Sequence, residues 1–285
     1  MEKIAVLVDS TSYMSEELKE NENLKIVYLS ATINNSTRKE LIDITSNEYK
    51  EYLTDDNNTF PTTSQPSIGE VVATLENLKE EGYTDVIAIS LSSGISGTFS
   101  SYSVASLMVP DINVHSFDSE VSCQAETFYV IKALELINQG KSPDEIIESL
   151  NDMKKYSKAY FVVDDLTHLH RGGRLNGAQA LIGNLLQVKP ILHFEDKIIV
   201  PYQKIRTYKK AIARILELFD EFYVENKGKN IHVCVIHVEA EDRAEELKEY
   251  LESNYNDINV DVGVIGPVIA THLGLGSVAI GWTIL

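Results

Sequence analysis

Short apolar runs rich in Val and Ile alternate along the chain with longer stretches of helical periodicity. This alternation is typical of βαβ units, in which helices cover both faces of a parallel sheet. The pattern predicts strands at residues 4–8, 25–29, 86–90, 114–117, 159–163, 231–238 and 259–264. Helices are predicted between them, among them 126–139 and 241–253. The expected fold class is therefore α/β.

Local signals mark where several helices begin or end. The tetrapeptides that start at Thr45 and at Ser142 both fit a capping box, and the second carries Pro143 at the first helical position. Gly140 stands where the helix 126–139 should end. We therefore expect new helices directly after Thr45 and Ser142.

The length and composition of the chain bear on its domain organisation. With 285 residues, of which 44% are hydrophobic and 24% charged, the chain can bury one large core or two smaller ones. Its character changes near residue 165, because nine Lys and Arg but only two acidic residues lie between Arg171 and Arg214. We expect a parallel-sheet N-terminal domain, residues 1–165, and a smaller α/β C-terminal domain, residues 166–285.

Charge and cysteine content exclude several classes of function. The net charge of −18 argues against nucleic acid as a partner, since binding phosphates needs a large basic face. Cys123 and Cys234 are too few for a disulfide framework or a CxxC metal site, and they indicate a reducing compartment. The first apolar run stops at Asp9, too early for a signal peptide or a membrane span. We expect a cytoplasmic protein.

Four loops rich in Ser, Thr and Gly stand out, at residues 9–12, 61–67, 90–101 and 263–276. Three of them follow a predicted strand, and open α/β sheets bind ligands beyond the carboxyl ends of their strands. Any one loop alone is typical of an ordinary turn. The four together indicate a binding crevice whose neutral donors could hold a carboxylate, each bond to a charged group contributing about 1.5 to 3 kcal/mol.

A nucleophilic site is an alternative. The segment Gly94–Thr98 nearly matches the G-x-S-x-G elbow, and Ser96, Asp118 and His272 follow the chain order of α/β-hydrolases. Thr98 stands where the last glycine of the elbow is needed. A serine hydrolase that uses these three residues therefore remains an alternative hypothesis at this point.

Phosphate and metal sites have weaker support. The tripeptide that starts at Gly140 lacks the first glycine of a P-loop and follows a helix, and the glycines near residue 275 have no ribose-binding acid at the required spacing. A metal site at Asp165 with His168 and His170 is conceivable, but the two histidines are two residues apart in a predicted loop with no further strong ligand nearby. We expect no metal.

Seven further motifs are spread along the chain. They are Asp9-Ser10-Thr11-Ser12, Thr63-Ser64-Gln65-Pro66, Ser92-Ser93-Gly94-Ile95-Ser96-Gly97-Thr98, Gly172-Gly173-Arg174, Lys189-Pro190-Ile191-Leu192, Arg206-Thr207, and Gly266-Pro267 with His272-Leu273-Gly274-Leu275-Gly276. Together they resemble the DegV family, and more closely the fatty-acid-binding subunit of bacterial fatty acid kinase. Arg171 and Leu275 are small departures from the family pattern. The motifs are in register over nearly the whole chain, so the resemblance is specific.

The resemblance implies a two-domain DegV-like fold with one long-chain fatty acid buried between the domains. It implies that Thr63, Ser96 and His272 bind the carboxylate. Supporting residues in the same loops are Ser10, Thr62, Ser93, Gly97 and Thr98. Arg174 and Arg206 match arginines implicated in contact with a partner or with acyl phosphate. The bound fatty acid is the expected ligand, with no cofactor and no catalytic residue.

The resemblance also implies a place in a two-component system. An ATP-dependent kinase subunit would phosphorylate the bound carboxylate to an acyl phosphate, which a downstream acyltransferase would use in phospholipid synthesis. This chain would then be a bacterial lipid-binding subunit and not itself an enzyme. A regulatory lipid sensor that works without a kinase is a further alternative.

Simple energetics fit a lipid carrier. Burial of a 16-carbon chain contributes about 12 kcal/mol at about 0.8 kcal/mol per methylene, against an association cost of about 4 to 15 kcal/mol. We expect the tail to supply affinity and neutral donors to fix its register, leaving the carboxylate nucleophilic, which a buried arginine would not. The basic stretch 171–214 is expected to receive an acidic partner, unless charges such as Lys209, Lys210 and Arg214 are merely a solvated helix face.

Overall fold

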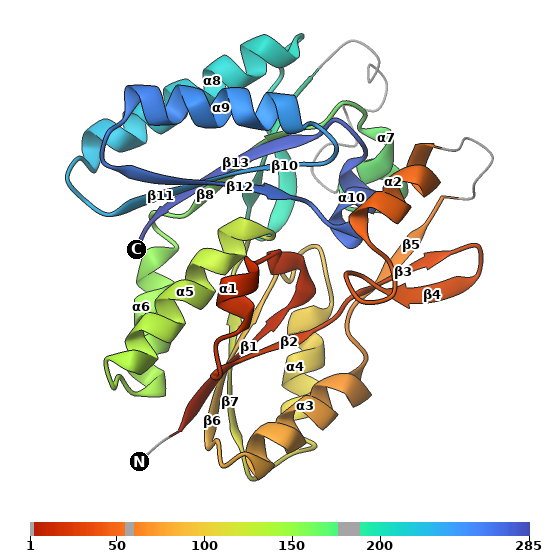
Figure 1. Cartoon of the computed structure of the whole chain (residues 1–285), viewed down its shortest axis with the longest axis vertical. Helices are drawn as coiled ribbons and strands as arrows, with labels where there is room; N and C mark the ends of the chain where they lie inside the picture. The colour runs from red at the N-terminus through yellow and green to blue at the C-terminus, as the bar shows by residue number, and fades with distance from the viewer. Residues whose placement is uncertain (1–2, 55–59, 176–188) are drawn as a thin grey trace.

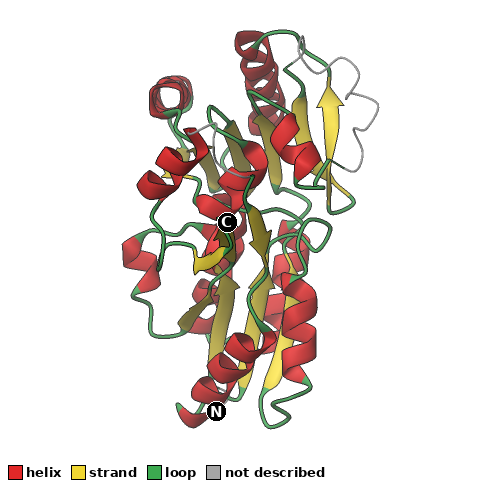
Figure 2. Cartoon of the chain, turned by 90° about the vertical axis from the view of Figure 1, so that its right-hand side faces the viewer, coloured by secondary structure: helices red, strands yellow, loops and turns green. Residues whose placement is uncertain are grey.

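The computed structural model describes residues 3–54, 60–175 and 189–285. These residues form two α/β layers that lie one above the other in Figure 1 and are seen from the side in Figure 2. Within the described part of the chain, no helix combines the length and the apolar character needed to cross a membrane.

The N-terminal layer is built on a parallel sheet with the strand order β2-β1-β6-β7. Its strands are β1 (Ile4–Asp9), β2 (Leu24–Val27), β6 (Asp85–Ser90) and β7 (Asn113–Asp118). Helices α3 (Ile68–Glu80) and α4 (Thr98–Ser106) cover one face, and α5 (Gln124–Asn138) and α6 (Pro143–Met153) cover the other (Figure 1). The expected parallel sheet with helices on both faces is confirmed.

The C-terminal layer is a mixed sheet with the strand order β10-β9-β8-β13-β11-β12. Its strands are β8 (Lys158–Val162), β9 (Ile191–Glu195), β10 (Ile198–Gln203), β11 (Ile231–His237), β12 (Ile258–Val264) and β13 (Val278–Ile284). Helices α8 (Tyr208–Glu225) and α9 (Glu241–Asn254) pack on its outer face. Because β8 belongs to this sheet, we propose a division between Met153 and Lys158, ahead of the expected position near residue 165.

Smaller elements complete the chain. A three-stranded antiparallel sheet has the order β4-β3-β5, with β3 (Ser30–Ile33), β4 (Ser36–Lys39) and β5 (Thr62–Ser64). The short helices are η1 (Ser10–Ser12), α1 (Glu16–Lys19), α2 (Ser46–Thr54), α7 (Thr167–Arg171) and α10 (Pro267–Leu273). These elements lie between the two layers and on their right-hand side in Figure 1.

The predicted strands are all present within two residues of their expected ends. Both capping boxes also form: the Ser142 hydroxyl accepts from the Glu145 amide, and Glu145 accepts from the Ser142 amide, with the same exchange between Thr45 and Glu48. The loop expected at residues 263–276 is corrected, because it contains α10. Pro267 at the first turn of α10 favours that helix.

Side chains of the six-stranded sheet alternate between two environments. Ala159 and Phe161 on β8 face the N-terminal layer, whereas Tyr160 and Val162 pack toward α8 and α9. This is the two-residue period of a strand. The sheet therefore has two buried faces, and its inner face shares one apolar core with β1, β6 and α5.

A row of small residues crosses this inner face. Ala159 pairs with Gly281, and Gly281 pairs with Cys234 on the next strand. The neighbouring row is bulkier, since Phe161 pairs with Ala279 and Ala279 with Ile236. The small row leaves space between the sheet and the N-terminal layer.

The hairpin of β9 and β10 fastens the two layers together. At its tip, the Lys197 carbonyl accepts a hydrogen bond from Ser92 Oγ at 2.6 Å, and Lys197 Nζ lies 3.0 Å from Asp118 Oδ2. A Cβ atom on Gly94 would lie 2.3 Å from the Lys197 carbonyl oxygen. Glycine is therefore required at position 94 by the close approach of the hairpin.

We expect Gly94→Ala to lower the free energy of unfolding by about 1 to 3 kcal/mol, because the added methyl group pushes the hairpin away. Urea denaturation measures this loss. Gly69→Ala in α3 is the matched control: nothing lies within 4 Å of its added Cβ, so the helix should gain up to about 1 kcal/mol. Equal effects of the two substitutions would contradict the proposed role of the hairpin contact.

Candidate functional site

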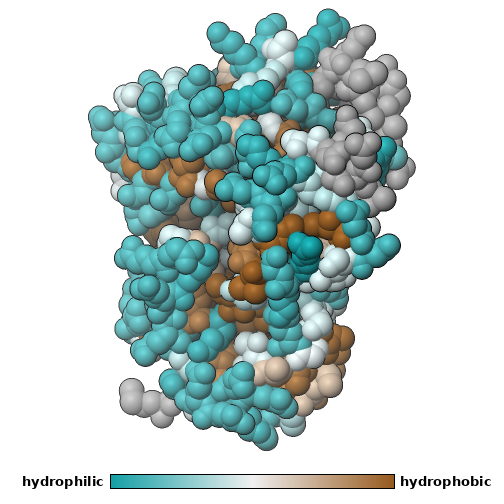
Figure 3. All heavy atoms as spheres, turned by 45° about the vertical axis from the view of Figure 1, so that its right-hand side comes forward, coloured by the Kyte–Doolittle hydropathy of each residue, from teal (hydrophilic) through white to brown (hydrophobic). Residues whose placement is uncertain are grey.

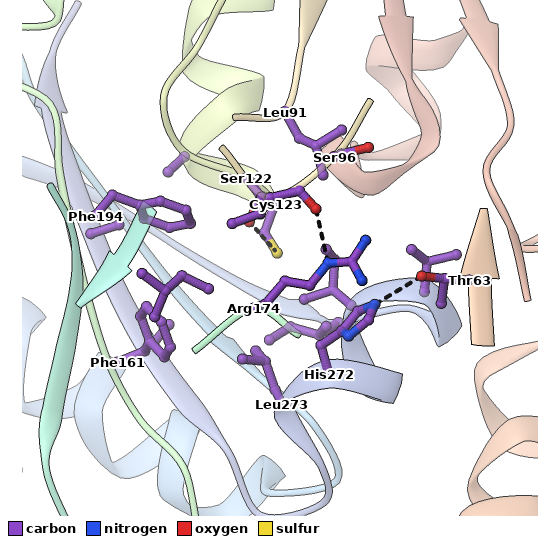
Figure 4. Close-up of a pocket in the computed structure, with 18 of the residues that line it drawn as sticks. Thr63, Leu91, Ser96, Ser122, Cys123, Phe161, Arg174, Phe194, His272 and Leu273 are labelled. Atoms are coloured by element: carbon purple, nitrogen blue, oxygen red, sulfur yellow. Dashed lines mark hydrogen bonds between the residues drawn. The ribbon is translucent and has the colours of Figure 1, made fainter. Parts of the chain in front are cut away.

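A cavity of about 330 Å³ lies between the two layers. This volume falls in the range of small-molecule sites in proteins. Apolar side chains form most of its wall, and both layers contribute, for example Leu91 from one side and Phe161 and Phe194 from the other (Figure 4). The outer surface in Figure 3 is mostly hydrophilic, with hydrophobic residues gathered at mid-height, where the layers meet.

One end of the cavity is polar, and the three residues expected to bind a carboxylate all line it: Thr63, Ser96 and His272. Thr63 is the central residue of β5, Ser96 lies in the turn before α4, and His272 is in the last turn of α10. Thr63 Oγ1 and His272 Nε2 are 2.8 Å apart (Figure 4). Ser96 Oγ is 2.9 Å from Thr98 Oγ1. The structure thus brings these distant residues together, and their binding role stays a prediction.

His272 is held as a neutral imidazole. Burial, followed by the nearby charges of Arg174 and His168, lowers its pKa to about 3. Its Nδ1 atom is buried and has no hydrogen-bond partner among the described residues. A Cβ on Gly172 would lie 2.1 Å from this Nδ1, so the first glycine of the Gly172-Gly173 pair permits the backbone of α7 to reach the ring.

Arg174 also lines the cavity, which corrects the expectation that only neutral donors surround the polar end. Its Nε donates to the Ile95 carbonyl at 3.0 Å and its Nη1 donates to the Gly172 carbonyl at 2.5 Å. Burial lowers the pKa of this guanidinium. Two backbone carbonyls therefore hold a half-buried positive charge in the wall of the cavity (Figure 4).

The predicted supporting residues, and Arg206 as a predicted partner contact, lie partly at the cavity and partly away from it. Gly97 lines the cavity, and Thr98 donates its amide to Ser96 Oγ at 3.3 Å. Ser93 instead bonds Asp118, and Thr62 and Arg206 are exposed. Arg206 lies just before Thr207, the N-cap of α8, outside the cavity wall. Of the basic stretch 171–214, residues 176–188 lie outside the described part of the chain.

Ser10 is linked to the cavity only indirectly, through the buried carboxyl group of Glu40. Its hydroxyl donates to Glu40 Oε1 at 2.6 Å. Glu40 Oε2 accepts from the Tyr13 hydroxyl at 3.1 Å and from the Val268 amide at 3.0 Å. Val268 lies in the first turn of α10, the helix that carries His272 in its last turn, so this network positions α10. No sequence signal marked Glu40, which follows a polar hairpin.

The partners of the three hydrolase candidates differ from those of a catalytic triad. In a triad the imidazole bonds the serine and the aspartate bonds the imidazole. Here His272 bonds Thr63, and Asp118 bonds Ser93 and Lys197. Burial opposes ionisation of Asp118, but these bonds lower its pKa overall. The geometry of the described residues does not support a serine hydrolase.

The histidines near residue 168 have structural contacts. His168 Nδ1 lies 3.2 Å from the Thr271 carbonyl, and its ring packs on Phe60. Asp165 accepts a bond from the Thr167 amide at 2.8 Å. Among residues 3–54, 60–175 and 189–285, no three His, Cys, Asp or Glu side chains are grouped to hold a metal ion.

Comparisons with known proteins match the chain over its whole length. A family model described as "Uncharacterised protein, DegV family" matches residues 3–284. Protein DegV from Bacillus subtilis (strain 168) is 49% identical over 280 residues, which are 98% of each chain. The crystal structure of DegV, a fatty-acid-binding protein from Bacillus subtilis, has a TM-score of 0.94 and 48% identity and covers 100% of both chains. The fatty-acid-binding DegV family protein SAG1342 from Streptococcus agalactiae has a TM-score of 0.92 and 33% identity, again over 100% of both chains.

The buried Glu40 predicts a pH-dependent stability. Burial raises its pKa to about 7, although Ser10, Val268 and Tyr13 donate to it. From pH 4.5 to 7 the unfolded chain loses this proton while the folded chain keeps it, so the free energy of unfolding falls as the pH rises. We expect wild type to lose up to about 3 kcal/mol relative to Glu40→Gln across this window.

Urea unfolding of both proteins at pH 5 and pH 8 tests this difference. Glu17→Gln, at an exposed position of α1, controls for the loss of a carboxylate in general. A difference between wild type and Glu40→Gln that stays constant with pH would show that Glu40 titrates normally.

Proposed function

This chain belongs to the DegV family, and we propose on that basis that it binds one long-chain fatty acid in the cavity between its two layers. The family assignment that the sequence motifs suggested is confirmed by the full-length matches. The observation that carries the proposal is the cavity itself, which has apolar walls and one polar end at Thr63, Ser96 and His272. An amphiphile with a single acidic head fits this distribution.

The tail of the ligand would lie along the inner face of the six-stranded sheet. Beyond His272 the cavity wall passes Phe161 and then the small row of Ala159, Gly281 and Cys234. These small residues leave room for methylenes, and each buried methylene contributes about 0.8 kcal/mol. Affinity would therefore come mainly from this apolar stretch.

The head would be oriented by hydrogen bonds. With its neutral ring, His272 offers one N–H donor, and Thr63 and Ser96 each offer a hydroxyl. Arg174 adds a fixed positive charge in the same wall, which favours an anionic head over a neutral one. Because its Nε and one N–H of its Nη1 already donate to carbonyls, a side-on clamp of the carboxylate through Nε is not available. The remaining N–H groups can still face the carboxylate.

We further propose that the bound carboxylate is presented to a separate ATP-dependent kinase subunit. This subunit would convert it to an acyl phosphate for a downstream acyltransferase and phospholipid synthesis. The polar end of the cavity lies near exposed cations, Arg171 in α7 being one of them, and a guanidinium suits a phosphoryl group. In this proposal the chain binds its substrate and the partner performs the catalysis.

Purified protein from a bacterial host is expected to carry a fatty acid in about one-to-one ratio. Denaturing extraction followed by mass spectrometry identifies and counts the ligand. Delipidated protein should bind hexadecanoic acid but bind its methyl ester more weakly by about 10-fold, since the ester loses a charged hydrogen-bond acceptor. Folded protein that arrives empty and binds neither compound would overturn the proposal.

Ser96→Ala is expected to separate binding from presentation. Loss of one hydroxyl should weaken hexadecanoic acid binding by less than about 10-fold, because the tail dominates affinity. Acyl-phosphate formation with the candidate kinase subunit and ATP should fall further, because the carboxylate loses its register. The assay compares Kd with the initial rate at saturating lipid.

Ser100→Ala on the exposed side of α4 is the matched control and should change neither quantity. Equal losses of binding and phosphorylation in Ser96→Ala would contradict a separate orienting role. Intact lipid binding with no phosphorylation by any kinase subunit of the host would favour a lipid sensor instead. Covalent labelling of Ser96 by a fluorophosphonate would favour the hydrolase.

A further inference from the structure

A second cavity of about 130 Å³ adjoins the first at the end remote from His272. The two share a wall made of Ala159 and Phe194, which line both. Ala159 belongs to the small row that forms the far part of the first cavity. The second cavity therefore begins where the space for a hydrocarbon tail ends.

This second cavity lies where two strands part. The pairing between β8 and β9 ends at Tyr160 and His193, and Ala159 and Phe194 are the next residues beyond this pair. Only one side chain on each strand thus separates the two spaces, and that of Ala159 is a methyl group. Phe194 is half-buried on the hairpin that is fastened at Lys197.

The lining of the second cavity is mostly polar, unlike the wall it shares with the first. Tyr129 and Ser157 both line it, and the Ser157 hydroxyl donates to the Met153 carbonyl at 3.1 Å. Ser157 Oγ also lies 2.8 Å from Thr283 Oγ1. Tyr129 is only 1% exposed and Ser157 is half-buried, so the Tyr129 hydroxyl lies inside the protein and Ser157 lies closer to the surface.

Charge in the second cavity is close to balanced. Lys154 Nζ donates to Glu120 Oε1 at 2.9 Å and lies 4.5 Å from the centre of the Phe117 ring, so its charge is already paired. The side chain of Lys158 is exposed. His193 is stacked on Tyr160, and burial lowers its pKa, which keeps the ring uncharged at neutral pH. A neutral group that both donates and accepts hydrogen bonds suits this lining better than an anion.

We propose that this second cavity is a subsite for a hydroxyl group at or next to the ω end of a fatty acid, held by the hydroxyls of Tyr129 and Ser157. The inference rests on the proposed function, because the carboxylate end must lie at His272 for the tail to reach this point. A hydroxyl can pass an apolar tunnel at far lower cost than a carboxylate. The ligand class is therefore ω-hydroxylated long-chain fatty acids.

The test compares matched acids of 14 to 18 carbons, with and without an ω-hydroxyl, by competition for delipidated protein. For at least one length, wild type should bind the hydroxy acid as tightly as the plain acid or more tightly. Without a partner for the hydroxyl, the same change would weaken binding by about 10-fold or more. Tyr129→Phe should weaken the hydroxy acid by about 5- to 10-fold and change the plain acid by less than about 2-fold.

Tyr102→Phe is the matched control, since Tyr102 is equally buried but packs with α3 and α4, away from both cavities. Its hydroxyl has no partner among the described residues, so its loss should alter neither ligand. If Tyr129→Phe fails to fold, Ser157→Ala at the same pair replaces it.

The outcomes distinguish this inference from the proposed function. Binding of plain acids with rejection of the hydroxy acid at every length would overturn the subsite and leave the proposed function intact. Equal losses of both ligands in Tyr129→Phe would show a purely structural tyrosine and overturn the subsite too. Tighter binding of an α,ω-dicarboxylic acid than of the hydroxy acid would overturn the assignment to a hydroxyl. Failure to bind any fatty acid would overturn the proposed function as well.

Discussion

Burial of the inner face of the six-stranded sheet is the constraint on which the rest of the structure depends. This face is apolar, and it is covered only because β1, β6 and α5 of the other layer share its core. Separation of the layers would expose that core to water, which hydrophobic burial opposes in proportion to area. The candidate site is a gap left in this shared core by a row of small residues, so the fold and the binding space have one origin.

The polar end of the cavity adds a second requirement, which is the placement of hydrogen-bonding groups inside an apolar interior. Buried polar groups need partners, and most of those around the site have them. Glu40 holds α10 through Val268, and two carbonyls hold Arg174. The unpartnered Nδ1 of His272 is an exception among the described residues and lies beside the cavity. The side chains that would contact a ligand are thus held in place by neighbouring groups that would not contact it themselves.

The sequence predicted the parts of this structure that depend on local pattern. Runs of Val and Ile gave the strands of the parallel sheet, because a strand buried on both faces needs apolar residues throughout. The pattern did not predict β5, whose residues Thr62–Ser64 are all polar and pair with β3 far away in the chain. Likewise, β13 follows a glycine-rich segment and was not expected as a strand. The motif residues of the site were expected, but the entry of Arg174 into the wall depends on where its side chain turns after folding.

The position of β13 links synthesis of the chain to completion of the site. It is the last strand in chain order, yet it lies between β8 and β11 in the middle of its sheet. During translation the N-terminal sheet is synthesised first, and β8 and β11 are both made before β13, the strand that pairs with each of them. Because His272 precedes this strand by only a few residues, a nascent chain can complete its first layer while the wall of the candidate site is still unfinished. The candidate site is therefore complete only once β13 has joined its sheet.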